Sequence, residues 1–126
     1  MEDSFDRFGR FLMKFVRDQS ISEWRRIIDG HMKDETSLFI KKQLDDFSEK
    51  NVVFIRDLIP EIVDTTIHYL LFGIEQNDDI EIVVEDENGA RTRMSEESDG
   101  LAGELYSSDG WIAQFSNEDV FNKKKI

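Results

Sequence analysis

Hydrophobic side chains follow a helical period over the first part of the chain. The stripe consists of Phe5, Phe8, Leu12, Phe15 and Val16. Its spacing of three to four residues predicts a helix over about 4–18. Phe11 and Met13 fall outside the stripe, so this helix is apolar over a wide arc. We expect it either to be covered on two sides or to offer an aromatic surface to another chain.

Two further helices are expected before residue 50. Ser20 and Glu23 have the spacing of a capping box, which predicts the start of a second helix with Ile27 and Ile28 on its inner face. A third helix is expected from about Thr36, with its charged positions in solvent. The pattern therefore describes a helical N-terminal half.

Residues 51–74 form the most apolar stretch with helical spacing. Pro60 interrupts it, and proline is tolerated in the first turn of a helix but not in its interior. We therefore expect a short helix that ends near Leu58 and a new, central helix that begins at Pro60.

The period changes after residue 79. Ile80, Ile82 and Val84 alternate with mostly polar neighbours, which indicates a half-buried strand. Asn88-Gly89 is a strong hairpin signal, and a returning strand is expected over 90–94. Its two arginines, at positions 91 and 93, would face the same solvent side as the glutamates at positions 81 and 85, so that opposite charges pair across the strands.

A short internal repeat follows the hairpin. The pattern Ser-Asp-Gly-apolar occurs at 98–101 and again at 108–111, each time before a short apolar run, at 101–106 and 111–115. Turn residues followed by short apolar runs at this interval predict further strands of an antiparallel meander.

These patterns predict one α+β domain over residues 1–122. About four or five N-terminal helices, in residues 1–75, would pack on a C-terminal antiparallel β-meander of three to four strands in the acidic part, residues 76–119. Residues 123–126 are expected to be a frayed basic tail. Ten Phe and two Trp among 126 residues supply enough large apolar groups for a core.

Charge is distributed unevenly along the chain. The net charge is −12; residues 1–74 hold 14 acids and 11 bases, whereas residues 75–119 hold 14 acids and only two bases. Such a field repels nucleic-acid phosphates and anionic membranes and attracts basic partners. The alternative is that the charge only keeps a small domain soluble.

Cysteine is absent, so disulfides and thiolate metal sites are excluded. The first residues are acidic where a signal peptide would be basic, and the longest apolar run, 69–74, is too short to span a membrane. We expect a cytoplasmic protein with neither a membrane nor a nucleic acid as its partner, and no cofactor.

No strong catalytic signature occurs. The chain has no glycine-rich phosphate loop, no Gly-x-Ser-x-Gly and no His-Glu-x-x-His. The best local candidate for a metal site or an acid–base pair is Glu61, Asp64 and His68, at offsets of three and four on an expected helix. The alternatives are that His68 sits at the edge of the core beside Asp64, or that both residues face water.

The acidic half also carries aromatic residues. Tyr106 and Trp111 are amphipathic enough to anchor an interface, although core packing explains them equally well. The candidate partner-binding residues are Glu85, Asp86, Glu87, Glu96, Glu97, Asp99, Asp109 and Trp111.

Residues 64–71, 98–105 and 111–116 resemble small bacterial proteins, some of which are immunity proteins of polymorphic toxin systems. The resemblance implies an intracellular protein that neutralises a toxin by binding it and performs no chemistry of its own. Our leading hypothesis is therefore an acidic module that inhibits a basic toxin such as a nuclease. The alternatives are a metal-dependent or acid–base enzyme and a homo-oligomeric adaptor that uses the Phe-rich first helix.

Overall fold

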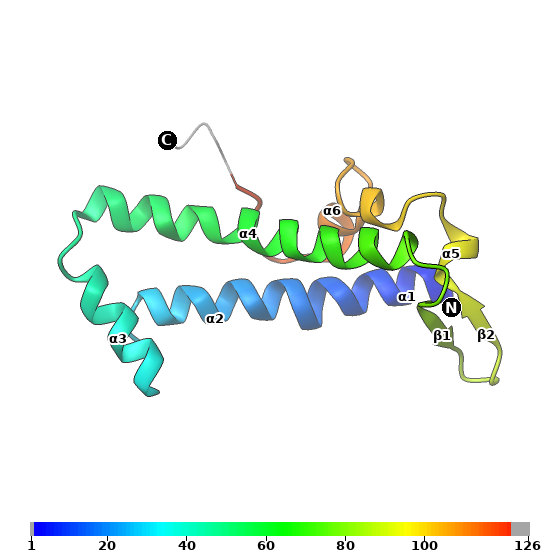
Figure 1. Cartoon of the computed structure of the whole chain (residues 1–126), viewed down its shortest axis with the longest axis horizontal. Coiled ribbons are helices and arrows are strands. Elements are labelled where there is room, and N and C mark those ends of the chain that lie inside the picture. Colours follow the sequence, from blue (N-terminus) through cyan, green and yellow to red (C-terminus); the bar gives the residue numbers. More distant parts are fainter. Residues whose placement is uncertain (1, 122–126) are drawn as a thin grey trace.

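Two long, antiparallel helical rods form the body of the molecule (Figure 1). The computed structural model describes residues 2–121. The first rod is continuous and comprises α1 (Ser4–Phe11), a π-helix η1 (Leu12–Arg17) and α2 (Asp18–Ile28). After α3 (Glu35–Leu44), the second rod is the single helix α4 (Glu49–Glu75). None of the helices in the described part of the chain combines the length and hydrophobicity needed to cross a membrane.

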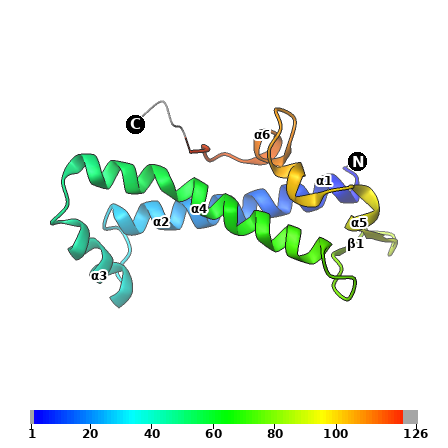
Figure 2. The same ribbon diagram turned by 45° about the horizontal axis from the view of Figure 1, so that its top comes forward.

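The remaining elements are short. A hairpin of β1 (Val83–Glu85) and β2 (Arg91–Arg93) leads into α5 (Met94–Glu97), then a 3-10 helix η2 (Leu101–Leu105) and α6 (Trp111–Phe115). Figure 2 shows the segment that contains α6 lying on one side of the two rods. The chain is thus mostly helical, with a small antiparallel sheet. The expected basic tail at 123–126 lies outside the described residues.

The capping box predicted that a new helix starts at Ser20, but the first rod continues through this position without a break. Instead, the backbone widens to a π-helix at Leu12–Arg17, in which the N–H of Asp18 bonds to the carbonyl of Met13. The wider turn places Leu12, Met13 and Arg17 all in the interior. Capping side chains do begin three other helices: Asp3, Asp34 and Ser48 each accept the backbone N–H three residues later.

The expected helix boundary at Pro60 is wrong, because α4 runs through it without interruption. A proline inside a helix costs about 3 kcal/mol through a lost hydrogen bond and a steric clash. Here the proline ring is fully buried, and Ile59 and Val63 beside it belong to the core. Burial of the surrounding apolar surface therefore offsets the local cost of the proline. Rules based on the sequence of one helix do not include this burial against other elements.

The predicted hairpin is confirmed. Val83 pairs with Arg93 and Glu85 with Arg91, on either side of a turn in which Gly89 has a φ of +83°. The charged side chains share a face as expected, with Arg93 Nη2 3.1 Å from Glu81 Oε2 and Arg91 Nε 3.9 Å from the nearest carboxylate oxygen of Glu85.

The predicted meander of three to four strands is not found in residues 2–121, where the sheet has two strands. Residues 101–105 and 111–115 are short helices instead. Leu101 and Leu105 are four residues apart, as are Trp111 and Phe115, and all four side chains are buried. A spacing of four places two side chains on one face in a helix and in a strand alike. A half-buried strand would also bury the residue midway between them, but Gly103 and Ala113 are exposed, as they are in these helical turns.

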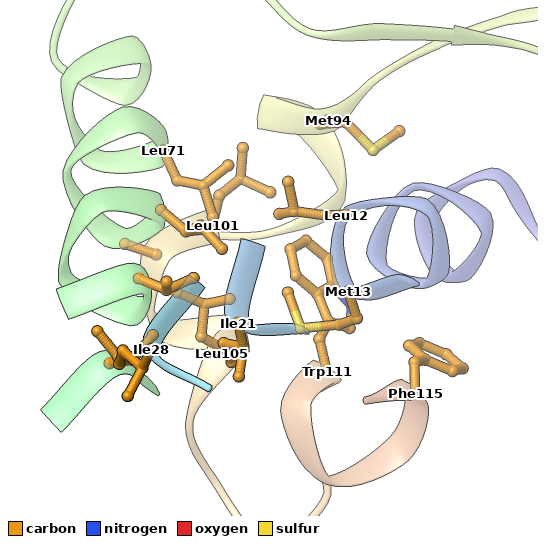
Figure 3. Packing of buried hydrophobic residues seen from close by; sticks show 14 of the residues in the cluster. Leu12, Met13, Ile21, Ile28, Leu71, Met94, Leu101, Leu105, Trp111 and Phe115 are labelled. Carbon is orange, nitrogen blue, oxygen red and sulfur yellow. The ribbon is translucent and has the colours of Figure 1, made fainter. Parts of the chain in front are cut away.

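The core lies where η2 and α6 close over the two rods (Figure 3). Trp111 is its largest side chain, at 1% exposure, and its ring lies 5.1 Å from that of Phe5 and 5.6 Å from that of Phe8. The indole sits directly on Gly9, where an added Cβ would be only 2.4 Å from Nε1. A glycine on α1 is therefore what lets α6 dock.

A buried ion pair joins the two rods. The Arg17 guanidinium is fully buried and makes two bonds to the Asp64 carboxylate on α4, from Nε at 2.6 Å and from Nη2 at 3.1 Å. Its other bonds go to Ser116 Oγ at 2.7 Å, to the carbonyl of Glu118 at 2.7 Å and to that of Asp119 at 3.0 Å. A guanidinium has five N–H donors, so every one is used.

We expect Gly9→Ala to lower the free energy of unfolding by about 1–3 kcal/mol, because the new methyl group overlaps the Trp111 ring. The matched control is Gly73→Ala in α4, where an added Cβ meets nothing within 4 Å. That change should raise stability by about 0.5–1 kcal/mol through the backbone entropy of glycine. Urea denaturation followed by circular dichroism measures both, and equal effects of the two changes would contradict this packing.

We expect Arg17→Met to cost about 3–5 kcal/mol, because it leaves the Asp64 carboxylate buried without its partner. Lys41→Met, which removes an exposed ion pair with Asp45, is the control and should cost no more than about 1 kcal/mol. The double change Arg17→Met with Asp64→Leu should recover part of the loss. The importance of the pair is refuted if the single Arg17 variant is as stable as the wild type in thermal melts at pH 7.

Candidate protein-binding surface

One end of the elongated molecule gathers acidic residues from distant parts of the chain. The start of α1, the hairpin and α5 all lie at this end (Figure 1). We call it the acidic end and define it by Glu2, Asp3, Asp6, Glu85, Asp86, Glu87, Glu96 and Glu97. Two separate segments, which are about 80 residues apart in the sequence, thus present one negatively charged surface.

A cleft of about 410 Å³ opens between the N-terminus and the hairpin. Its lining residues are Glu2, Ser4, Arg7, Glu85, Asp86 and Glu87. Arg7 is the one base in this lining, and its Nη1 donates to the backbone carbonyl of Glu85 at 3.1 Å. Four carboxylates against one guanidinium leave the cleft with a net negative charge.

Two carboxylates at this end have shifted pKa values. Partial burial raises the pKa of Asp6, and repulsion from Asp3 and Glu2 raises it further, against the attraction of Arg10. The hydroxyl of Ser95 donates to Glu81 and lowers the pKa of that carboxyl, an effect to which Arg93 adds. Asp6 is therefore part of a repulsive cluster, whereas Glu81 is held in place at the start of α5.

The sequence-predicted acids fall into two groups. Glu85, Glu87, Glu96 and Glu97 are exposed at the acidic end, together with the half-buried Asp86. Asp86 also has a structural role, because its Oδ1 accepts the backbone N–H of two residues in the hairpin turn, each at 2.9 Å.

Asp99 and Asp109 are exposed as well, but they lie in the loops before and after η2. Asp109 accepts the hydroxyl of Ser107 at 2.9 Å, as an acid in a tight turn does. Asp109 is therefore explained by its turn, whereas Asp99 follows Glu97 of the acidic end by two residues.

Trp111 is not a surface residue, so its predicted role as an interface anchor needs correction. It is the centre of the core, because a large indole gains more from full burial against Phe5, Phe8 and Gly9 than from partial exposure. Tyr106, the other aromatic candidate, is exposed.

Sequence reasoning missed Glu2, Asp3 and Asp6 as members of the charged surface. Their signal was visible as acids at the start of the first helix, where they also favour the positive end of the helix dipole. Nothing in the linear sequence indicated that the hairpin would fold back beside this turn.

Glu61, Asp64 and His68 do not form one free site. Asp64 is buried and bonded to Arg17, Glu61 points to solvent, and Nδ1 of His68 lies 3.2 Å from the Tyr106 hydroxyl. No group of three or more His, Asp or Glu side chains that could hold a metal ion together occurs within residues 2–121. Asp64, the middle residue of the predicted site, instead forms the ion pair with Arg17 that joins the two rods.

Comparisons of the chain with protein-family models, with curated protein sequences and with solved structures found no match. The candidate surface is therefore defined by geometry and charge alone.

Proposed function

We propose that this chain is an acidic protein-binding module of the immunity or inhibitor kind, which neutralises a basic partner, such as a nuclease toxin, by direct binding. The observation that carries the proposal is the convergence of carboxylates from the N-terminus, the hairpin and α5 on one end of the molecule.

Electrostatics explains why such an end suits a basic partner. Carboxylates that lie within the Debye length, about 8 Å at physiological salt, add their potentials at the surface. This potential accelerates the encounter with a positively charged protein and orients it before contact. The same potential disfavours nucleic acids and anionic membranes as partners.

The cleft gives this surface a contact point. Its volume of about 410 Å³ has room for a lysine or arginine side chain, and the acids that line it supply acceptors. Arg7 is tied to a hairpin carbonyl rather than to a carboxylate. Glu2 is paired with Arg10 at 2.7 Å and Glu85 with Arg91 at 3.9 Å, both at exposed positions, so an incoming cation would compete with weak surface pairs for these acids.

The test compares two variants with the same change in charge. Glu85→Gln, Glu87→Gln and Glu97→Gln together remove three of the eight acids that define the acidic end and spare Asp86, which the turn needs. The control, Glu35→Gln, Asp46→Asn and Glu49→Gln, removes three exposed acids around α3 and the start of α4, at the other end of the molecule. Each protein is used as bait in lysate of the source cells at 50 mM and 300 mM salt.

We expect the wild type and the control to retain a basic protein at low salt and to lose most of it at high salt. The acidic-end variant should lose it at both, since three of its acidic side chains no longer carry charge. Retention of only neutral or acidic proteins, or equal loss in the two variants, contradicts the proposal.

A second candidate, self-association, has one specific observation in its favour. Phe11 and Phe15 on the first rod are both at least half exposed and stack on each other with ring centroids 5.8 Å apart. Exposed apolar pairs of this kind are common at interfaces between subunits.

If a second copy covers this pair, light scattering should give twice the monomer mass at high micromolar concentration, and Phe11→Ser with Phe15→Ser should restore the monomer. Trp24→Ser, which removes an exposed aromatic elsewhere on the rod, is the control. A monomeric wild type over the whole concentration range rules this candidate out.

A further inference from the structure

A second surface of the molecule is built from aromatic rings rather than from carboxylates. We call it the aromatic patch and define it by His68, Tyr69 and Phe72 on α4 and by Tyr106, which directly follows η2. The side chains of Tyr69, Phe72 and Tyr106 are 63%, 44% and 46% exposed. These residues lie outside the buried core cluster, so packing alone does not account for them.

The patch is held together by its own contacts. His68 is its centre, with ring centroids at 4.9 Å from Tyr69, 6.2 Å from Phe72 and 5.8 Å from Tyr106. The Tyr106 hydroxyl lies 3.2 Å from His68 Nδ1, which links η2 to α4 across the patch. Because the rings are fixed against one another, these four side chains would lose little conformational entropy when a ligand contacts them.

Positive charge is absent from the segments that form this surface. The sequence has no lysine or arginine between Arg56 and Arg91, and none between Arg93 and Lys123. Both arginines of the hairpin have carboxylate partners there, Arg91 with Glu85 and Arg93 with Glu81. No basic side chain from the elements of the patch therefore covers the exposed ring faces.

Carboxylates lie close to the patch. The pKa of the Tyr106 hydroxyl is raised by partial burial and then by the negative charges of Asp64 and Glu61. Asp64 is neutralised by Arg17, but Glu61 is exposed about two turns before His68 on the same helix, and its charge acts on Tyr106. Electron-rich ring faces in such a negative potential attract a cation.

The exposed aromatic rings favour one kind of cation over another. A lysine ammonium is compact and strongly hydrated, whereas the planar arginine guanidinium is weakly hydrated and stacks on aromatic faces. A nucleic-acid base could also stack, but its phosphates would meet the net charge of −12.

We infer that the aromatic patch is a second contact surface, which binds an arginine side chain of a basic protein partner by stacking on Tyr69 and Phe72, in the negative potential of the surrounding acids. This inference rests on the proposed function, because it concerns the same basic partner. It adds that the partner presents an arginine, which the acidic end alone would not distinguish from a lysine. The patch thus supplies selectivity for arginine, and the acidic end supplies attraction for positive charge in general.

The test uses three peptides of equal length: acetyl-(Gly-Arg)4-amide, the corresponding lysine peptide, and a neutral peptide with citrulline in place of arginine. Titration calorimetry at low salt gives the three dissociation constants, and amide shifts in NMR spectra locate the contact. A cation–π contact at an exposed site is worth up to about fivefold in affinity. We expect the arginine peptide to bind about two- to fivefold more tightly than the lysine peptide, with shifts at residues 68, 69, 72 and 106.

The preference should disappear in the double variant Tyr69→Leu with Phe72→Leu, where both peptides bind alike. Phe54→Leu removes an exposed ring elsewhere on α4 and should keep the preference, as should Tyr106→Phe, which loses only the hydroxyl. Circular dichroism verifies that each variant is folded.

The two proposals fail in distinguishable ways. Neutralising Glu85, Glu87 and Glu97 should weaken the arginine and lysine peptides by the same factor and leave their ratio unchanged. A wild-type ratio near one, or a ratio that survives the loss of Tyr69 and Phe72, overturns the role of the aromatic patch but not that of the acidic end. A dimer that dissociates in the Tyr69 and Phe72 variant also overturns it, because a second copy then occupies the patch.

Discussion

The fold depends on one buried charge. Arg17 enters the interior from the first rod, and Asp64 meets it from the second, so the two longest elements of the chain are joined by a pair of charges that water does not reach. Desolvation of such a pair is costly and is offset only when every donor finds an acceptor. The segment at 116–119 completes the set with one hydroxyl and two backbone carbonyls. Arg25 adds an ion pair to Glu118, so the end of the described chain is fixed to the first rod by two arginines. The guanidinium therefore specifies how three distant segments meet, more than it adds net stability.

This arrangement separates the charges that hold the fold from those that face outward. The first rod uses Arg7, Arg10, Arg17 and Arg25 for contacts within the molecule. The acids of the hairpin and α5 outnumber the bases around them and remain exposed. A net charge of −12 on a small chain works against compactness through self-repulsion. Partial burial and this repulsion together raise the pKa of Asp6. A positively charged partner of the kind proposed above would relieve the repulsion.

The sequence predicted the local features well and the long-range ones poorly. Helical periodicity located the N-terminal helices, and Asn88-Gly89 located the hairpin, because both signals depend on neighbours within a few residues. Pro60 and the capping box at Ser20 suggested boundaries that do not exist, since packing between the rods overrides local preference. The repeated Ser-Asp-Gly predicted strands that are short helices in the structure, because the four-residue spacing of the buried side chains after each glycine fits one face of a strand as well as a helical turn. The hairpin acids were expected at the surface, but their proximity to Glu2 and Asp3 results from tertiary folding, for which the sequence carries no local signal. His68 was chosen as a metal ligand for its distance from Asp64, whereas its aromatic neighbours Tyr69 and Phe72 were the more informative context.

The π-helix at Leu12–Arg17 has a consequence for how this chain tolerates change in length. A π-turn is equivalent to one extra residue in an α-helix, and each residue rotates the helix by about 100°. Gly9, which receives Trp111, lies before that extra residue, and Arg17, which receives Asp64, lies at its end. The widened turn sets the angle between these two docking faces. Loss of a single residue there would restore a regular α-helix and leave the two faces in nearly the same orientation. A change of the same six residues to regular α-helix, with no residue removed, would instead rotate one face by about 100° from its partner. The segment should therefore tolerate the loss of one residue better than the loss of its π-helical geometry.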